Sequence, residues 1–189
     1  QEKKRAEAVR TSGAIQVDGK LDEASWQAAS PATSFIIYNP QNGAPSSYRT
    51  EVRILYDDDA LYIGAFMYDS TPDSIFTELG QRDEGDINAD HFWVEISPFN
   101  DGLNGDMFKV SASNVQIDNK MTTTEDWGHN SDTWDAVWQS RTRVNDEGWV
   151  AELKIPYSAL RFPRSDTQLW GINFWREVRR TRETSSWNF

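Results

Sequence analysis

Two oxygen-rich loops have the spacing that most directly suggests chemistry. The side-chain oxygens belong to Asp86, Asn88 and Asp90 in the loop 83–90, and to Asp101, Asn104 and Asp106 in the loop 100–106. Calcium takes roughly six to eight oxygen ligands, and carboxylates and amides supply them. Asn, Asp and Gly also favour tight turns for purely local reasons. A structural Ca²⁺ site and ordinary hairpin turns are therefore both open interpretations of these loops.

Tryptophan is the second unusual feature, with nine residues in a chain of 189. An indole buries a large apolar area while its N–H seeks a partner, so tryptophan favours interfaces and binding faces. Its flat ring can also stack on a sugar. The tryptophans outside the clearest inward-facing patterns are Trp93, Trp127, Trp134 and Trp187. Core packing is the alternative for each of them.

Catalytic and redox motifs are not found. The chain has no cysteine and only two histidines, His91 and His129, and no G-x-S-x-G, H-E-x-x-H or phosphate-binding loop. A haem held by one histidine and one of Met67, Met107 or Met121 is a lesser alternative, because methionine more often fills a core. We therefore expect a domain that is not an enzyme.

Composition bounds the remaining classes of function. A length of 189 residues favours a single domain. The formal charge of −11 argues against a nucleic-acid partner, because phosphate binding relies on lysine and arginine. No apolar run approaches the roughly 18 residues of a membrane-spanning helix. We expect no membrane insertion by this domain.

Alternation with a period of two dominates the chain and positions these residues. It predicts strands over 51–56, 61–68, 91–97, 108–112, 136–144, 149–155 and 169–178. The strand 61–68 (LYIGAFMY) is apolar on both faces, which predicts a central strand. Helical signal is limited to 22–29 and a single turn over 156–160. The predicted fold is an all-β, antiparallel β-sandwich with one or two short helices.

Four ordered motifs resemble carbohydrate-binding module family 9. They are 15–26 (IQVDGKLDEASW), 50–57 (TEVRILYD), 90–96 (DHFWVEI) and 148–156 (GWVAELKIP). The resemblance covers about residues 14–189, which we expect to form one domain after a leader segment, 1–13. It implies a β-sandwich, structural calcium and a saccharide held between two tryptophans.

A narrower resemblance is to bacterial, Bacteroidetes-like proteins in which this module precedes an outer-membrane β-barrel of unknown function. It rests on 82–83, 99–101, 134–138, 160–163, 170–174, and Glu183 before Trp187. It implies a cell-envelope location after removal of a signal peptide, a link to carbohydrate catabolism, and a C-terminal barrel of the same polypeptide as a partner. The sequence would then be a domain excised from a longer protein.

The resemblance also indicates a site. Trp187 stands near the position of the C-terminal clamp tryptophan, Lys109 stands where the family often has arginine, and Asn173 with nearby arginines would bind hydroxyls. The second clamp position falls in 86–89 (DINA), which has no tryptophan, so Trp93 or Trp127 would replace it. We predict a non-catalytic carbohydrate-binding module. The alternative is a structural or gating domain that docks on its own barrel without a glycan.

Overall fold

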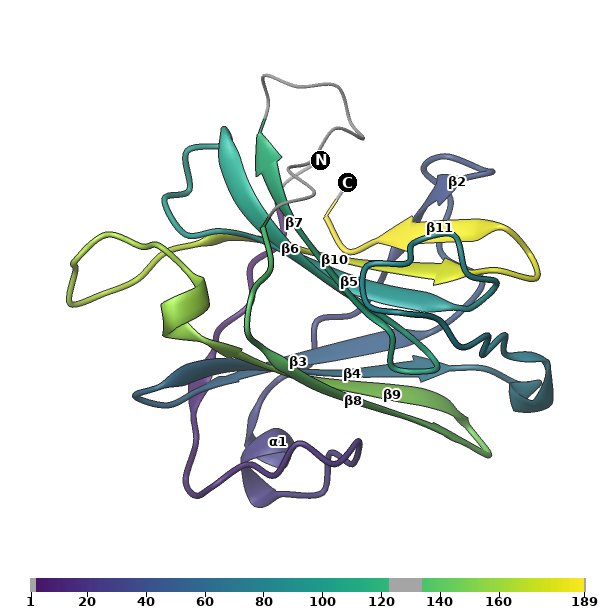
Figure 1. Cartoon of the computed structure of the whole chain (residues 1–189), viewed down its shortest axis with the longest axis horizontal. Coiled ribbons are helices and arrows are strands. Elements are labelled where there is room, and N and C mark those ends of the chain that lie inside the picture. The colour runs from purple at the N-terminus through teal and green to yellow at the C-terminus, as the bar shows by residue number, and fades with distance from the viewer. Residues whose placement is uncertain (1–2, 123–133, 189) are drawn as a thin grey trace.

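Two stacked sheets make up the molecule (Figure 1), as seen in a computed structural model that describes residues 3–122 and 134–188. The predicted antiparallel β-sandwich is confirmed. The five-stranded sheet has, in spatial order, β1 (Val9–Arg10), β3 (Thr50–Tyr56), β4 (Ala60–Tyr68), β9 (Gly148–Pro156) and β8 (Gln139–Asn145). Among the described strands, β1 and β3 form the one parallel pair.

The six-stranded sheet carries the features described below. Its spatial order is β2 (Ile36–Asn39), β11 (Glu183–Ser186), β10 (Gly171–Val178), β5 (His91–Ser97), β6 (Asn104–Ser111) and β7 (Gln116–Thr122). Strand β5 is central and pairs antiparallel with both β10 and β6. Its inward side chains Phe92, Val94 and Ile96 are buried in the core between the sheets, so His91, Trp93 and Glu95 lie on the outer face.

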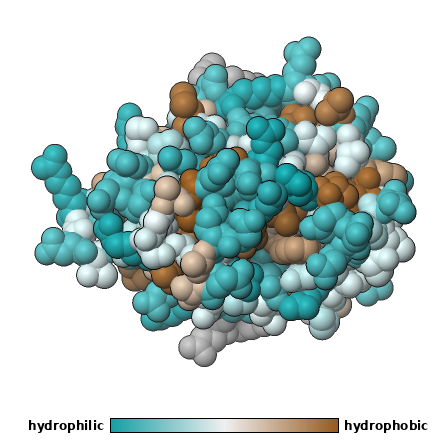
Figure 2. Space-filling view, turned by 90° about the horizontal axis from the view of Figure 1, so that it is seen from below, coloured by the Kyte–Doolittle hydropathy of each residue, from teal (hydrophilic) through white to brown (hydrophobic). Residues whose placement is uncertain are grey.

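The predicted central strand β4 is buried on both faces. Helix α1 (Ala24–Ala28) lies against the outer face of its sheet, and Trp26 packs there with Leu55 and Tyr62. Gly64 allows this approach, because a Cβ at that position would lie 2.7 Å from Cζ3 of Trp26. Seen from below, this side of the molecule is largely hydrophilic with small hydrophobic areas (Figure 2).

A buried arginine ties the two sheets together at one end of the sandwich. Arg176 on β10 is 1% exposed, and its guanidinium donates to the carbonyls of Arg49 and Tyr68, at 3.0 Å each. These carbonyls lie at the ends of β3 and β4 in the opposite sheet. Burial lowers the pKa of Arg176 to about 10, which leaves it charged at neutral pH.

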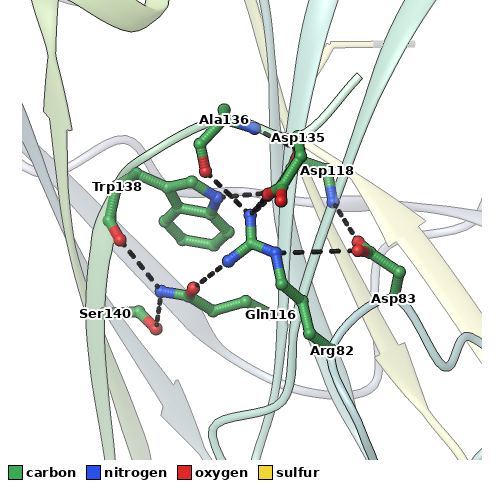
Figure 3. A network of polar contacts seen from close by, with 8 residues as sticks. All are labelled: Arg82, Asp83, Gln116, Asp118, Asp135, Ala136, Trp138 and Ser140. Carbon is green, nitrogen blue, oxygen red and sulfur yellow. Dashed lines mark hydrogen bonds and ion pairs between the residues drawn. The ribbon is translucent and has the colours of Figure 1, made fainter. Parts of the chain in front are cut away.

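A second tie joins β7 to the segment that leads into β8 (Figure 3). The buried carboxylate of Asp118 accepts hydrogen bonds from Ala136 N and Trp138 Nε1, both at 2.9 Å, and pairs with Arg82. Arg82 also donates to the Ala136 carbonyl at 2.8 Å. The remaining short elements are the 3₁₀ turns η1 (Pro72–Ser74) and η2 (Tyr157–Ala159). None of the helices in the described ranges has the length and apolar character needed to cross a membrane.

Candidate functional site

The outer face of the six-stranded sheet carries a row of three aromatic side chains, Tyr38, Trp175 and Trp93, which we call the aromatic row. Trp175 and Trp93 are cross-strand partners on β10 and β5, and their rings are parallel within 2° at a centroid distance of 5.6 Å. Tyr38 on β2 meets Trp175 edge-on at 5.5 Å. At the other end, Lys109 on β6 places its Nζ 5.2 Å from the Trp93 ring centroid. Four strands thus align these side chains across the sheet.

Glu95 holds the Trp93 indole from the next outward position on β5. Its carboxylate accepts a hydrogen bond from Trp93 Nε1 at 3.3 Å. Burial raises the pKa of Glu95, and the N–H groups of Trp175 and Trp93 oppose that rise. The row therefore has a polar, titratable group at its base.

A charged rim borders the row on its other side. His91 Nδ1 lies 3.1 Å from Glu177 Oε2, and Arg179 Nη1 lies 3.3 Å from Glu177 Oε1. Burial lowers the pKa of His91, so a neutral imidazole donates to the carboxylate, and this hydrogen bond lowers the pKa of Glu177. Arg179 also donates from Nε to the Asn88 side chain at 3.4 Å. The loop 83–90 thus reaches the rim of the aromatic row.

The structure brings together two of the predicted sugar-binding residues, Trp93 and Lys109, and separates the others. Trp187 is 3% exposed and packs on Phe174 in the core, so the prediction that it presents a stacking surface is wrong. Asn173 does not have a free amide either, because its side chain bonds the backbone of Asn188 in both directions, at 3.1 and 2.8 Å. Trp127 lies outside the described residues.

Several of the predicted calcium ligands are bonded to donors of the protein itself. In the first loop Asp86 is exposed, whereas Asp90 is buried and accepts from Arg179 N at 3.0 Å. In the second loop Asp101 accepts from the backbone of Leu103 at 2.8 Å, and Asp106 pairs with Lys120 at 2.5 Å. Within the described ranges, no group of three or more acidic or histidine side chains is placed to hold a metal ion. Calcium binding by these two loops stays a prediction.

A hollow of about 660 Å³ lies at the end of the sandwich beside β6 and β7. Trp134, Phe99, Asp106 and Lys120 are among its lining residues, and the Lys120 ammonium covers the Trp134 ring at 4.2 Å. Trp134 was a candidate ligand-facing tryptophan, and the structure places it here, where its ring meets that of the core residue Phe108 at 5.9 Å. Of the predicted sugar-binding residues, Trp93 and Lys109 lie together on the outer face and do not line this hollow.

A family model described as "Carbohydrate family 9 binding domain-like" matches residues 17–178. That range includes every strand from β2 to β10, and hence the whole aromatic row. The chain belongs to this family. A comparison of this chain with curated proteins found no match.

Solved structures share the fold of this family 9-like domain. A family 9 carbohydrate-binding module from Caldicellulosiruptor kristjanssonii, in complex with cellotriose, has 16% identity and a TM-score of 0.59 over 96% of this chain and 88% of that one. A structure of a family 9 module from the same organism in complex with glucose has 18% identity and a TM-score of 0.59, over 96% of this chain and 90% of that one. A candidate carbohydrate-binding protein from Bacteroides uniformis has 13% identity and a TM-score of 0.69, over 96% and 88%. All three confirm the sandwich architecture.

Sequence reasoning missed Trp175, Tyr38 and Glu95 as members of the site. Trp175 alternates with Phe174 and Arg176 on a strand that was predicted correctly, so its outward direction was available from the pattern. What the pattern lacks is the register that sets Trp175 beside Trp93, because the two residues lie far apart in the chain.

Proposed function

We propose that this family 9-like domain binds a saccharide on the outer face of the six-stranded sheet, across the aromatic row. The observation that carries the proposal is the row itself, in which Tyr38, Trp175 and Trp93 lie side by side with Lys109 and Glu95. Sugar-binding surfaces combine aromatic carbon with a few well-placed polar groups. Family membership and the folds of modules solved with cellotriose and glucose support the same function.

The geometry favours contact of the sugar with the edges of the indoles over stacking on their faces. One face of Trp93 is covered by Trp175 and the other by Lys109, so a sugar ring has no open indole face there on which to stack. Tyr38 is 48% exposed and offers the most accessible aromatic surface of the row. We propose that the saccharide lies along the outward edges of the indoles and against Tyr38, with the rim groups hydrogen-bonded to its hydroxyls.

Titration calorimetry against a glycan panel tests this function. We expect saturable binding to at least one oligosaccharide, and a loss of at least about tenfold in affinity for Trp93→Ala. The matched control is Tyr68→Ala, because Tyr68 stacks on Phe66 at 4.2 Å and carries Arg49 over its ring on the other sheet. Binding that survives Trp93→Ala but is lost in Tyr68→Ala would contradict the proposed face, and an empty panel would contradict the function.

A further inference from the structure

Among the described residues, Lys109 is the one basic member of the site that forms no ion pair. Its ammonium lies over Trp93, and among the described residues no acidic group forms an ion pair with it. Lys120, which covers Trp134 in the same way, is paired with Asp106 at 2.5 Å. The two lysines share an aromatic partner and differ in whether they have a counter-ion.

The nearby carboxylates are engaged with other groups. Glu177 is bonded to His91 and to Arg179. Glu95 receives the indole N–H of Trp93. Glu177 and, more weakly, Asp86 in the loop 83–90 attract the Lys109 ammonium as charges, but neither forms an ion pair with it. The acceptors of Trp93 Nε1 and of the buried His91 Nδ1 are the carboxylates of these two glutamates.

Burial makes this isolated charge costly. It lowers the pKa of Lys109, which means that the site favours the ammonium less than water does. A cation–π contact supplies only part of the lost solvation. An anion placed against the ammonium would form a charge-assisted hydrogen bond, which is stronger than the bond to a neutral hydroxyl.

We infer that the saccharide bound here is anionic, with a uronate carboxylate or a sulfate ester placed against the Lys109 ammonium. The inference rests on the proposed function and adds to it the class of sugar. Arg179 lies at the adjoining rim, where it pairs with Glu177 and donates to Asn88.

Matched saccharides and matched variants test the inference. A glycan panel should contain neutral, C6-carboxylate and 6-sulfated forms of the same oligosaccharide backbones, measured by calorimetry at physiological salt. We expect at least one acidic form to bind about tenfold or more tightly than its neutral counterpart. The carboxylate and sulfate arms then show which anionic group the site takes.

Two substitutions assign any such preference to Lys109. In Lys109→Met, which keeps an unbranched apolar stem over Trp93, the acidic and neutral forms should bind equally, whereas Lys109→Arg should keep the preference. Lys154→Met is the control, because Lys154 lies 5.6 Å from the Tyr62 ring on the other sheet. Melting temperatures confirm that each variant folds.

The outcomes separate this inference from the function on which it rests. Neutral forms that bind as tightly as acidic ones would overturn the inference and leave saccharide binding intact. A preference that persists in Lys109→Met would also overturn it. No binding by any member of the panel would overturn the proposed function as well.

Discussion

The carboxylate of Glu152, in the middle of β9, caps the backbone of Gly19 across 133 residues of chain. Its Oε2 accepts hydrogen bonds from Gly19 N and from Asp18 N, both at 2.9 Å. This contact joins two of the sequence motifs, the D-G turn of 15–26 and the glutamate of 148–156. The two motifs are far apart in the sequence, and these hydrogen bonds from the turn to the Glu152 carboxylate link them physically.

Replacement of Glu152 with glutamine should change how stability depends on pH. Burial raises the pKa of Glu152 from its ordinary value of 4.5 to about 7. Between these values the folded state holds a proton that the unfolded state has released, so the stabilisation is complete below about pH 4.5 and is lost as the pH rises through 7. Each pKa unit corresponds to about 1.4 kcal/mol. Urea unfolding from pH 5 to 8 should therefore show Glu152→Gln gaining on the wild type as pH rises.

The exposed Glu147, in the turn between β8 and β9, provides the control for that series. Glu147→Gln should follow the wild-type curve at every pH. If the difference in free energy of unfolding between Glu152→Gln and the wild type stayed constant from pH 5 to 8, Glu152 would not titrate in this range.

Gly64→Ala should destabilise the domain by about 1–3 kcal/mol, because the added methyl would press on the Trp26 ring and on Leu21 Cδ2 at 2.8 Å. Chemical denaturation measures this directly. Gly13→Ala should cost little, since nothing lies within 4 Å of a Cβ at that position. When Gly64→Ala is combined with Trp26→Phe, the smaller ring should make room for the methyl group, so that Gly64→Ala costs less stability than it does in the wild type. An unchanged cost would show that the loss comes from the backbone of residue 64 and not from the contact with Trp26.

Loss of the Asp118 carboxylate should strongly destabilise the fold. Asp118→Ala leaves Ala136 N, Trp138 Nε1 and Arg82 without their acceptor, and we expect a cost of about 3–5 kcal/mol. Amide exchange at Ala136 should also accelerate. Asp135 pairs with Arg82 at 2.9 Å from the exposed side, so Asp135→Ala should cost less than about 1 kcal/mol. Equal costs for the two variants would contradict the role of burial.

Trp187 and Tyr38 should respond differently to truncation. Trp187→Ala removes a core ring and should lower the free energy of unfolding by about 3–5 kcal/mol. Tyr38→Ala should leave the melting temperature nearly unchanged and weaken saccharide binding, because Tyr38 is exposed. Calorimetric binding and thermal melts of both variants check this. Trp187→Phe, which keeps most of the core volume, should bind as the wild type does.

Most of the fold could be predicted from hydrophobic alternation, and the exceptions have identifiable causes. The predicted strand 91–97 coincides with β5, and 61–68 differs from β4 by one residue. Strand β7 was missed because its inward-facing Asp118 breaks the apolar pattern. That carboxylate is tolerated inside only because donors from outside the strand meet it, and no local sequence signal reports those donors.

The site was less predictable than the fold. Trp93 and Lys109 were identified as single residues, but their contact depends on the pairing of β5 with β6. The error at Trp187 has the same origin, since a tryptophan near the end of a chain has no local mark that distinguishes a core ring from an exposed one. Its burial follows from Phe174 on the neighbouring strand.

The mutual packing of the aromatic row has a thermodynamic consequence. The two indoles are already packed on each other and Trp93 is also bonded to Glu95, so a ligand would find these side chains with little rotational freedom left to lose. Ordering an unrestrained side chain on binding commonly costs about 0.5–1.5 kcal/mol. The entropy lost on binding would then come mainly from the glycosidic torsions of the saccharide. Restricting the conformations of the ligand should therefore improve affinity more than restricting those of the protein.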